Sequence, residues 1–182
     1  MPRNIEIKAR ITSVEALVPK VGLIADQGPF EIPQDDTYFA CATGRLKVRT
    51  FSRDDGELIY YRRSDQQAAK ESFYLRSPTS SPETMRRSLS LAYGQVGRVE
   101  KHRTLFLLGR TRIHLDKVSG LGHFLELEVV LDEHEPPEAG VHEANDLLAR
   151  LSVEPSQLIE GAYVDLLANN AGSQTVPRGS CT

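Results

Sequence analysis

Apolar and polar positions alternate along most of the chain, and the pattern changes to a helical spacing in the last third. In the first such segment Ile5, Ile7 and Ile11 fall on one face and polar residues on the other, which is the period-two pattern of a half-buried strand. Seven further segments share this alternation or are rich in β-branched and aromatic residues. The predicted strands cover residues 4–11, 35–39, 45–49, 58–63, 70–76, 98–107, 111–116 and 124–131.

Capping signals and helical spacing predict four helices. Thr12 and Glu15 form a capping-box pattern at the start of the first, which we expect to end near residue 22, and Pro19 predicts a kink or an early stop within it. Ser81 is the expected N-cap of the second, with proline at its first helical position. The other helices follow from leucine and alanine at helical spacing. These three helices cover residues 82–93, 141–151 and 158–167.

The segments between elements set the expected boundaries. Pro29 and Pro33 predict a loop before the strand at residues 35–39. From residue 169 onward the sequence consists mainly of Gly, Ser, Thr and Asn without an apolar period, which is typical of a flexible end. We therefore expect one catalytic domain over residues 1–168 and a C-terminal tail over residues 169–182.

Composition narrows the class of protein. The chain has 182 residues, 40% of them hydrophobic and 26% charged, as in one soluble globular domain. Its apolar runs are too short for a membrane span, and the charged N-terminus lacks an apolar signal core, so we expect a cytoplasmic protein. The net charge of −3 argues against binding of a nucleic acid duplex. Two distant cysteines exclude a disulfide framework.

Ionisable residues occupy the polar positions of six predicted strands. For any single strand, a sheet with one solvated face is the simpler interpretation. The helices favour a different one, because four amphipathic helices need an apolar surface to cover and the chain has no second sheet to offer them. We therefore predict an α+β fold: an eight-stranded antiparallel closed β-barrel, or tunnel, with a charged lumen and with helices packed outside.

Basic residues dominate the predicted lumen. Lys47 and Arg49 on one strand, and Lys101 and Arg103 on another, stand at i and i+2 and therefore point the same way. We expect their mutual repulsion to be relieved only by a ligand, because unpaired like charges are costly away from water. A polyanion fits, since arginine and lysine bind phosphoryl oxygens.

Three glutamates share the predicted lumen face. Glu126 and Glu128 alternate on one strand, about 7 Å apart, and Glu6 lies on another. Carboxylates are the hard-oxygen ligands of Mg²⁺ or Mn²⁺ and repel phosphate. Carboxylates together with cations therefore predict phosphates bridged by a metal ion.

Several short motifs carry a family resemblance. Residues 4–8, Asn-Ile-Glu-Ile-Lys, resemble the Glu-x-Glu-x-Lys signature of the CYTH superfamily, the triphosphate tunnel metalloenzymes, with Asn4 in place of the first glutamate. Further similar segments follow in order, so that the resemblance spans most of residues 4–168 and implies the tunnel architecture. These segments are residues 36–39, 44–49, 58–62, 99–103, 113–118 and 121–128.

The resemblance also implies roles for individual residues. It implies Mg²⁺ or Mn²⁺ as cofactor. The implied metal ligands are Glu6, Glu126 and Glu128, and the implied catalytic residues are Lys8, Asp116 and Arg103. The implied triphosphate-binding residues are Lys8, Arg45, Lys47, Arg49, Arg62, Lys70, Lys101 and Arg103.

Members of the superfamily handle a triphosphate with a divalent cation. The resemblance implies a metal-dependent triphosphatase acting on ATP, thiamine triphosphate or tripolyphosphate. The alternative is a class IV-type adenylate cyclase that makes cyclic AMP and pyrophosphate from ATP, because reaction type does not follow from fold. A non-catalytic polyphosphate-binding module is a second alternative, which the three glutamates disfavour. A homodimer is compatible with the sequence.

The histidines and tyrosines receive simpler interpretations. The five histidines have no metal-ligand spacing, so we expect surface or hydrogen-bonding roles. His114 differs, because it lies two residues before Asp116 and shares its face, where it could contact phosphate or assist a proton transfer. We expect Tyr60, Tyr61 and Tyr74 to pack within strands rather than to stack on a base.

Overall fold

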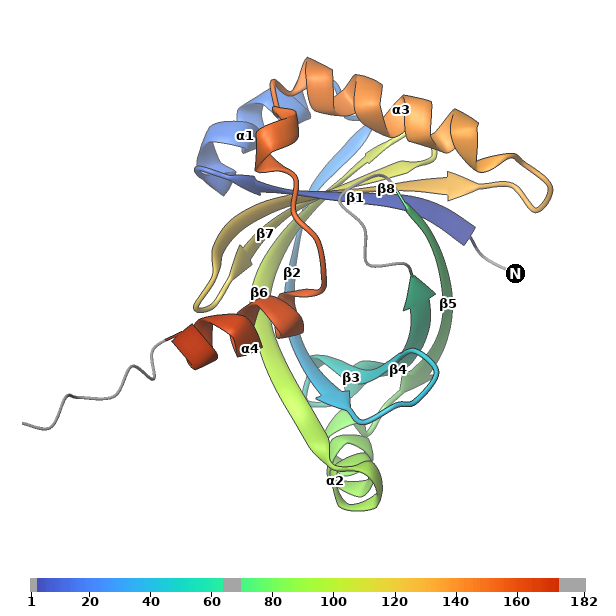
Figure 1. Cartoon of the computed structure of the whole chain (residues 1–182), viewed down its shortest axis with the longest axis vertical. Helices are drawn as coiled ribbons and strands as arrows, with labels where there is room; N and C mark the ends of the chain where they lie inside the picture. Colours follow the sequence, from blue (N-terminus) through green and yellow to red (C-terminus); the bar gives the residue numbers. More distant parts are fainter. Residues whose placement is uncertain (1–2, 64–69, 174–182) are drawn as a thin grey trace, which may run out of the picture.

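The computed structural model describes residues 3–63 and 70–173, in which eight antiparallel strands close into one ring and four helices lie around it (Figure 1). This confirms the predicted fold class. The order around the ring is β1-β5-β4-β3-β2-β6-β7-β8. The strands are β1 (Arg3–Ile11), β2 (Gln27–Phe39), β3 (Arg45–Ser52), β4 (Asp55–Arg63), β5 (Lys70–Thr79), β6 (Gln95–Leu108), β7 (Thr111–Val118) and β8 (Gly122–Leu131). The helices are α1 (Val14–Gly22), α2 (Pro82–Tyr93), α3 (Pro137–Arg150) and α4 (Tyr163–Ser173), with a 3₁₀ turn, η1, at Pro155–Gln157.

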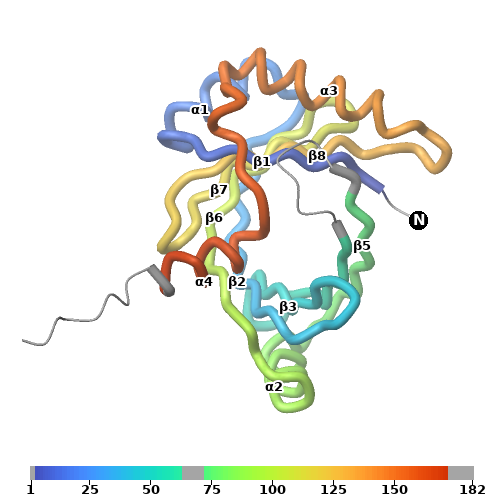
Figure 2. Tube along the Cα trace, in the orientation of Figure 1, coloured from blue at the N-terminus to red at the C-terminus, as the bar shows by residue number. Residues whose placement is uncertain are grey.

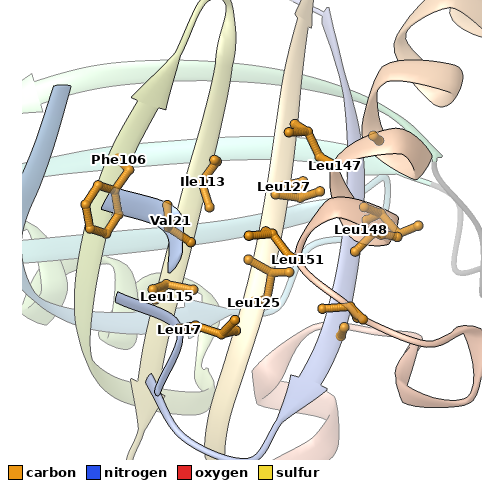
Figure 3. Packing of buried hydrophobic residues seen from close by; sticks show 14 of the residues in the cluster. Leu17, Val21, Phe106, Ile113, Leu115, Leu125, Leu127, Leu147, Leu148 and Leu151 are labelled. Atoms are coloured by element: carbon orange, nitrogen blue, oxygen red, sulfur yellow. The ribbon is translucent and has the colours of Figure 1, made fainter. Parts of the chain in front are cut away.

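The main apolar core lies outside the ring, between the strands and the helices. Helices α1 and α3 cover the side formed by β1, β7 and β8, whereas α2 lies at the opposite side of the ring (Figure 2). Leu17 and Val21 of α1 and Leu147 of α3 pack on Ile113 and Leu127 of the sheet (Figure 3). Burial of each such side chain contributes about 1.5–3 kcal/mol. The apolar strand face therefore points outward, and the charged face points into the lumen.

Helix α1 begins one residue later than the capping pattern indicates. Its N-cap is Ser13, whose hydroxyl accepts a hydrogen bond from the backbone amide of Ala16 at 3.3 Å. The prediction of Thr12 as N-cap was wrong, because the hydroxyl of the next residue, Ser13, caps the helix and also donates to Glu15. Pro19 lies inside the helix without ending it. The apolar face of α1 is buried against the barrel, and this packing offsets the hydrogen bond that proline cannot donate.

Strand β2 is much longer than predicted. It extends over Gln27–Phe39 and includes the segment that Pro29 and Pro33 indicated as a loop. Before Asp35 the register of β2 pairs it with β6 alone within the described chain. A strand with one free edge tolerates proline, because the missing amide hydrogen would point away from the partner.

The last predicted helix divides into two parts. Leu158 forms an extended bridge with Ala9, and the backbone amide of Ile159 donates to the carbonyl of Lys8 at 3.0 Å. Helix α4 begins at Tyr163 and continues to Ser173, beyond the expected start of the tail at residue 169. Residues 174–182 of the predicted tail lie outside the described residues. None of the described helices is both long and apolar enough to cross a bilayer.

Candidate active site

The lumen contains a cavity of about 340 Å³ with three zones. At one end, Tyr38 and Tyr61 of the barrel form an apolar cluster with Phe124, with Ala162 and with Tyr163, the first residue of α4. We call this the closed end. Charged side chains fill the middle, because alternate residues of every strand point inward. The opposite end is less buried. The prediction of a charged lumen thus describes the middle zone and not the closed end.

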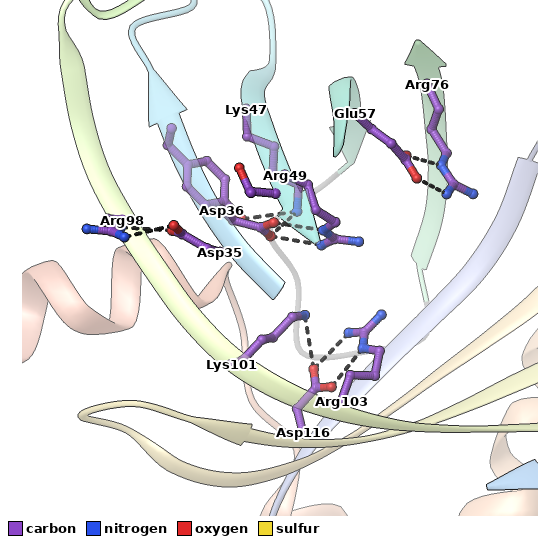
Figure 4. A network of polar contacts seen from close by, with 12 residues as sticks. Asp35, Asp36, Lys47, Arg49, Glu57, Arg76, Arg98, Lys101, Arg103 and Asp116 are labelled. Atoms are coloured by element: carbon purple, nitrogen blue, oxygen red, sulfur yellow. Dashed lines mark hydrogen bonds and ion pairs between the residues drawn. The ribbon is translucent and has the colours of Figure 1, made fainter. Parts of the chain in front are cut away.

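In the middle zone, Asp36 of β2 holds two basic residues of β3. The Lys47 ammonium donates to the carboxylate at 2.6 Å, and the Arg49 guanidinium donates to its two oxygens at 2.7 and 2.8 Å (Figure 4). Burial alone would raise the pKa of Asp36, but the positive charges of Arg49 and Lys47 outweigh it and hold that pKa well below its usual value. Burial, reinforced by the charge of Arg49, lowers the pKa of Lys47 to about 7.

Asp116 of β7 holds the second basic pair in the same way. Arg103 donates to both carboxylate oxygens at 2.7 Å, and Lys101 donates at 3.1 Å (Figure 4). The Tyr163 hydroxyl donates to the same carboxylate at 3.0 Å. Burial would raise the pKa of Asp116, but the charges of Arg103 and Lys101 hold it far below its usual value.

These pairs correct one expectation about the lumen. We expected the repulsion among Lys47, Arg49, Lys101 and Arg103 to be relieved only by a ligand. Instead, the carboxylates of β2 and β7 already pair all four within the protein. Sequence alternation placed the cations on the lumen face but could not show which carboxylates face them across neighbouring strands. Each cation is therefore positioned before any ligand arrives.

The three glutamates lie together on β1 and β8. Ligand oxygens of Glu6, Glu126 and Glu128 all lie within 4.8 Å of one another. Arg103 donates to Glu126 at 3.1 Å, and the ammonium of Lys8 is 3.9 Å from Glu126. Burial would raise the pKa of Glu126, but the charges of Lys8 and Arg103 lower it. Burial, with the negative charges of Glu6 and Glu126, raises the pKa of Glu128.

The chemistry of this group fits a divalent metal ion. Mg²⁺ and Mn²⁺ are bound by carboxylate oxygens, and three glutamate oxygens within 4.8 Å of one another could reach one ion after a small movement of the side chains. Asn4 precedes Glu6 by two residues and lines the same cavity. Its side chain is 1% exposed, and its Oδ1 accepts no hydrogen bond from the described residues. A buried oxygen without a donor is costly, and a cation would satisfy it.

The remaining predicted binding residues have different positions. Arg45 makes a two-fold ion pair with Asp165 of α4, at 2.8 and 2.7 Å, and is not among the residues that line the cavity. Arg62 is exposed beside Phe73 on the outer face of β4, because its neighbour Tyr61 occupies the inward position. The backbone of Lys70 pairs with Glu6, but its side chain lies outside the described part of the structure.

His114 lies in the cavity, as its spacing from Asp116 predicted. Its Nδ1 makes no hydrogen bond to a described residue and is 3.7 Å from a carboxylate oxygen of Glu128. Burial, together with the charge of Arg103, holds its pKa well below the usual value, so the imidazole is neutral. A neutral imidazole between an arginine and a carboxylate is suited to a hydrogen bond with a ligand oxygen.

Sequence reasoning missed two residues that organise the site. Asp36 stands two residues before Tyr38 on the strand that faces β3, so a confident register of β2 would have identified it opposite Arg49. Tyr163 supports the ammonium groups of Lys8 and Lys101, which lie 4.0 and 5.1 Å from the centre of its ring. No local signal marks Tyr163, because it reaches the lumen from a helix outside the strands.

The CYTH domain family model matches residues 2–163 of the chain. An adenylate cyclase named CyaB from Aeromonas hydrophila is 22% identical over an alignment of 183 positions, which covers 96% of this chain and 94% of that protein.

Two solved structures share the architecture. The PH1012 protein from Pyrococcus horikoshii is 26% identical with a TM-score of 0.80, over 90% of this chain and 99% of that one. HpAC1 from Hippeastrum, described as having a dominant triphosphatase activity, is 12% identical with a TM-score of 0.67, over 93% of this chain and 96% of that one. At 12% identity the likeness concerns the fold.

Proposed function

The chain belongs to the CYTH family, and we propose that it is a divalent-metal-dependent triphosphatase. One observation carries this proposal. Basic residues of β1, β3 and β6 and a cluster of three glutamates line the same cavity. Basic side chains suit a polyphosphate, and a carboxylate cluster suits the cation that accompanies it. A cavity for an anion alone would contain the basic residues without the cluster.

The basic residues bind and orient the triphosphate in this proposal. Arg49, Lys101 and Arg103 are held by carboxylates in fixed positions, so they donate to phosphoryl oxygens without first being ordered. Lys8 joins them from β1, with its ammonium over the ring of Tyr163. We assign the catalytic positions to Lys8 and Arg103, and we assign to Asp116 the holding of Arg103.

The metal ion would be held by Glu6, Glu126 and Glu128, and when bound it supplies positive charge that polarises a phosphoryl oxygen. Water attacks the terminal phosphorus and the bond to the bridging oxygen breaks. The products are orthophosphate and the diphosphate, and the proton of the attacking water passes to a product phosphate or to solvent. Negative charge that accumulates on the bridging oxygen is stabilised by the basic residues. His114 is placed to accept or donate one hydrogen bond to a phosphoryl oxygen or to the water.

Adenylate cyclase is the second candidate, and the similarity to CyaB over almost the whole chain favours it. In that reaction the ribose 3′-hydroxyl attacks the α-phosphorus and pyrophosphate leaves. The same basic residues would bind the triphosphate. The two reactions differ in which phosphorus faces the nucleophile.

Product analysis tests the proposal. The protein is incubated with ATP, tripolyphosphate and thiamine triphosphate in Mg²⁺ or Mn²⁺, and orthophosphate, pyrophosphate and cyclic AMP are separated. We expect orthophosphate; cyclic AMP with pyrophosphate would favour the cyclase, and binding without turnover would favour the non-catalytic module.

A matched pair of variants links the products to the cavity. Arg49→Met removes an inward guanidinium, and we expect it to reduce turnover about 100-fold or more. Arg98→Met removes an outward guanidinium, 48% exposed and paired with Asp35, and should leave turnover unchanged. Wild-type turnover in both variants would indicate that the reaction takes place outside the lumen.

A further inference from the structure

Within the described part of the chain, three side chains that line the cavity have a buried polar atom without a hydrogen-bond partner. They belong to Asn4, Gln34 and His114. Two of these atoms are amide oxygens, and the third is Nδ1 of the His114 imidazole. A buried polar atom without a partner is costly, so each of the three marks a place where an atom of a ligand would be stabilising. His114 is the one that offers a nitrogen.

His114 lies beside the glutamate cluster. On β7 it is directly opposite Glu126 of β8, and its partner on the other side, Leu105 of β6, has no polar atom in its side chain. The side chain of His114 is 4% exposed, and its Nδ1 lies 3.7 Å from Oε1 of Glu128. The other carboxylate oxygen of Glu128, Oε2, accepts a hydrogen bond from Arg112 at 2.9 Å. Nδ1 therefore lies beside the oxygen that Arg112 does not hold.

The separation of these two atoms favours a lone pair, rather than a hydrogen, on Nδ1. Hydrogen bonds from nitrogen to oxygen are about 2.7–3.2 Å long, and a carboxylate acceptor shortens them further. A hydrogen on Nδ1 would draw His114 and Glu128 into that range, whereas the observed separation is 3.7 Å. Two neighbouring lone pairs repel each other, and a cation bound by both atoms would remove that repulsion.

We propose that Nδ1 of His114 is a fourth ligand atom of the cation site formed by Glu6, Glu126 and Glu128, and that it makes the site select a first-row transition-metal ion over Mg²⁺. This inference rests on the cation site of the proposed function. Oxygen ligands suit Mg²⁺, whereas an imidazole nitrogen suits transition-metal ions. In this arrangement Nε2 carries the hydrogen and can donate it to a phosphoryl oxygen or to water.

Pulsed electron paramagnetic resonance of the Mn²⁺-loaded protein, without substrate, detects a ligand nitrogen directly. We expect a nitrogen coupling in the wild type that changes when histidine is labelled with ¹⁵N. His114→Gln should lose the coupling, because glutamine keeps a hydrogen-bonding side chain but has no imidazole nitrogen. His102→Gln is the matched control and should retain it, since His102 is 51% exposed on β6 and pairs with Glu31 outside the lumen.

Calorimetric titration with Co²⁺ and with Mg²⁺ tests the selectivity. His114→Gln should weaken Co²⁺ binding about 100-fold, as expected for the loss of a ligand. It should change Mg²⁺ binding much less, so that the preference for Co²⁺ falls. His102→Gln should bind both ions as the wild type does. Equal losses for the two ions in His114→Gln would show that the imidazole is not a ligand, and would overturn the proposal.

The wild-type spectrum gives an answer even if His114→Gln fails to fold. Bound Mn²⁺ without a histidine nitrogen coupling would overturn the fourth ligand. In that case, release of orthophosphate from a triphosphate would leave the triphosphatase proposal standing. Failure of the wild type to bind Mn²⁺, Co²⁺ and Mg²⁺ would overturn the two proposals together.

Discussion

Two carboxylates in the same cavity, Asp36 and Glu128, have opposite pKa shifts. Asp36, on the side formed by β2 and β3, is buried and has its pKa held well below the usual value, despite its burial, by the charges of Arg49 and Lys47. Glu128, on the side formed by β1 and β8, has its pKa raised by burial and by its glutamate neighbours, and its partner Arg112 does not reverse this. Burial acts on both carboxylates, and the local balance of charge decides the sign.

The opposite pKa shifts of Asp36 and Glu128 indicate a different role for each side of the cavity. Carboxylates outnumbered by cations fix those cations in place and leave a net positive surface for an anion. Glu128 instead belongs to a group of three glutamates with neighbouring oxygens, which a further cation would neutralise. The first group is therefore part of the structure of the protein, and the second is a candidate site for a ligand.

The largest predicted effect is a loss of stability when Asp36, which holds two buried cations, is replaced. Asp36→Asn leaves Arg49 and Lys47 without their buried partner, which costs about 3–5 kcal/mol of unfolding free energy. Urea unfolding without ligand measures it. Glu31→Gln is the control, because Glu31 of β2 is 52% exposed and pairs with the exposed His102, so its loss should cost at most about 1 kcal/mol. Similar costs for the two variants would contradict the distinction between the groups.

Removing a charge from the group of Glu6, Glu126 and Glu128 should change the stability of the metal-free protein in the opposite direction. Glu128→Gln removes one negative charge from a cluster in which that charge is unfavourable, so the metal-free protein should be as stable as the wild type or more so. Affinity for Mn²⁺ should fall about 100-fold, as expected for loss of a ligand oxyanion. Calorimetric titration with Mn²⁺ measures this, with the outward Glu100→Gln as control. A strong loss of stability with unchanged Mn²⁺ affinity would show that Glu128 is structural.

A smaller predicted effect is a gain in Mn²⁺ affinity when Asn4 is replaced by aspartate. Asn4→Asp adds a fourth carboxylate of nearly the same shape, so we expect Mn²⁺ affinity to rise about tenfold, because ligand charge tunes divalent-cation affinity. Gln34→Glu is the matched control, since Gln34 is also a buried lumen amide whose oxygen accepts no hydrogen bond from the described residues. It lies on β2, away from the glutamates. If both variants gain affinity equally, general charge rather than position is responsible.

The smallest predicted effect is the uptake of a proton by Lys47 when tripolyphosphate binds. The pKa of Lys47 is lowered to about 7 by burial and by Arg49, so at pH 8 about nine in ten of these side chains are neutral without ligand. A phosphate beside Lys47 favours the charged form. Tripolyphosphate binding at pH 8 should therefore take up close to one proton, and its affinity should fall as pH rises above 7.

Calorimetry in buffers of different ionisation enthalpy measures this uptake. Lys47→Arg is the control, because arginine stays charged at pH 7 and at pH 8. Proton uptake on tripolyphosphate binding should therefore fall by about one proton in that variant. Undiminished uptake would assign the proton to another group.

Much of the fold could be predicted because alternation and closure constrain each other. The apolar positions of β1 and β8 require cover, and helices α1 and α3 provide it, so the charged face had to point inward. Predictions from the local sequence pattern were wrong where a tertiary contact changed the local structure. Pro33 is accepted in β2 because one edge has no partner there in the described chain, and Leu158 leaves its helical period because it pairs with Ala9.

The chemical types of the site residues, and the strand face on which they lie, follow from the amino-acid sequence. The alternating Glu126 and Glu128, and Lys101 and Arg103, had to point into one lumen, since successive side chains of a strand alternate. Their partners follow from the folded arrangement: Asp116 holds Arg103, Arg62 faces outward, and Tyr163 reaches the lumen from α4. Register, strand order and helix docking fix these contacts, and they depend on residues far apart in the chain. The charge on each side chain is set by those neighbours, so Asp36 and Glu128 acquire opposite pKa shifts that no local pattern could indicate.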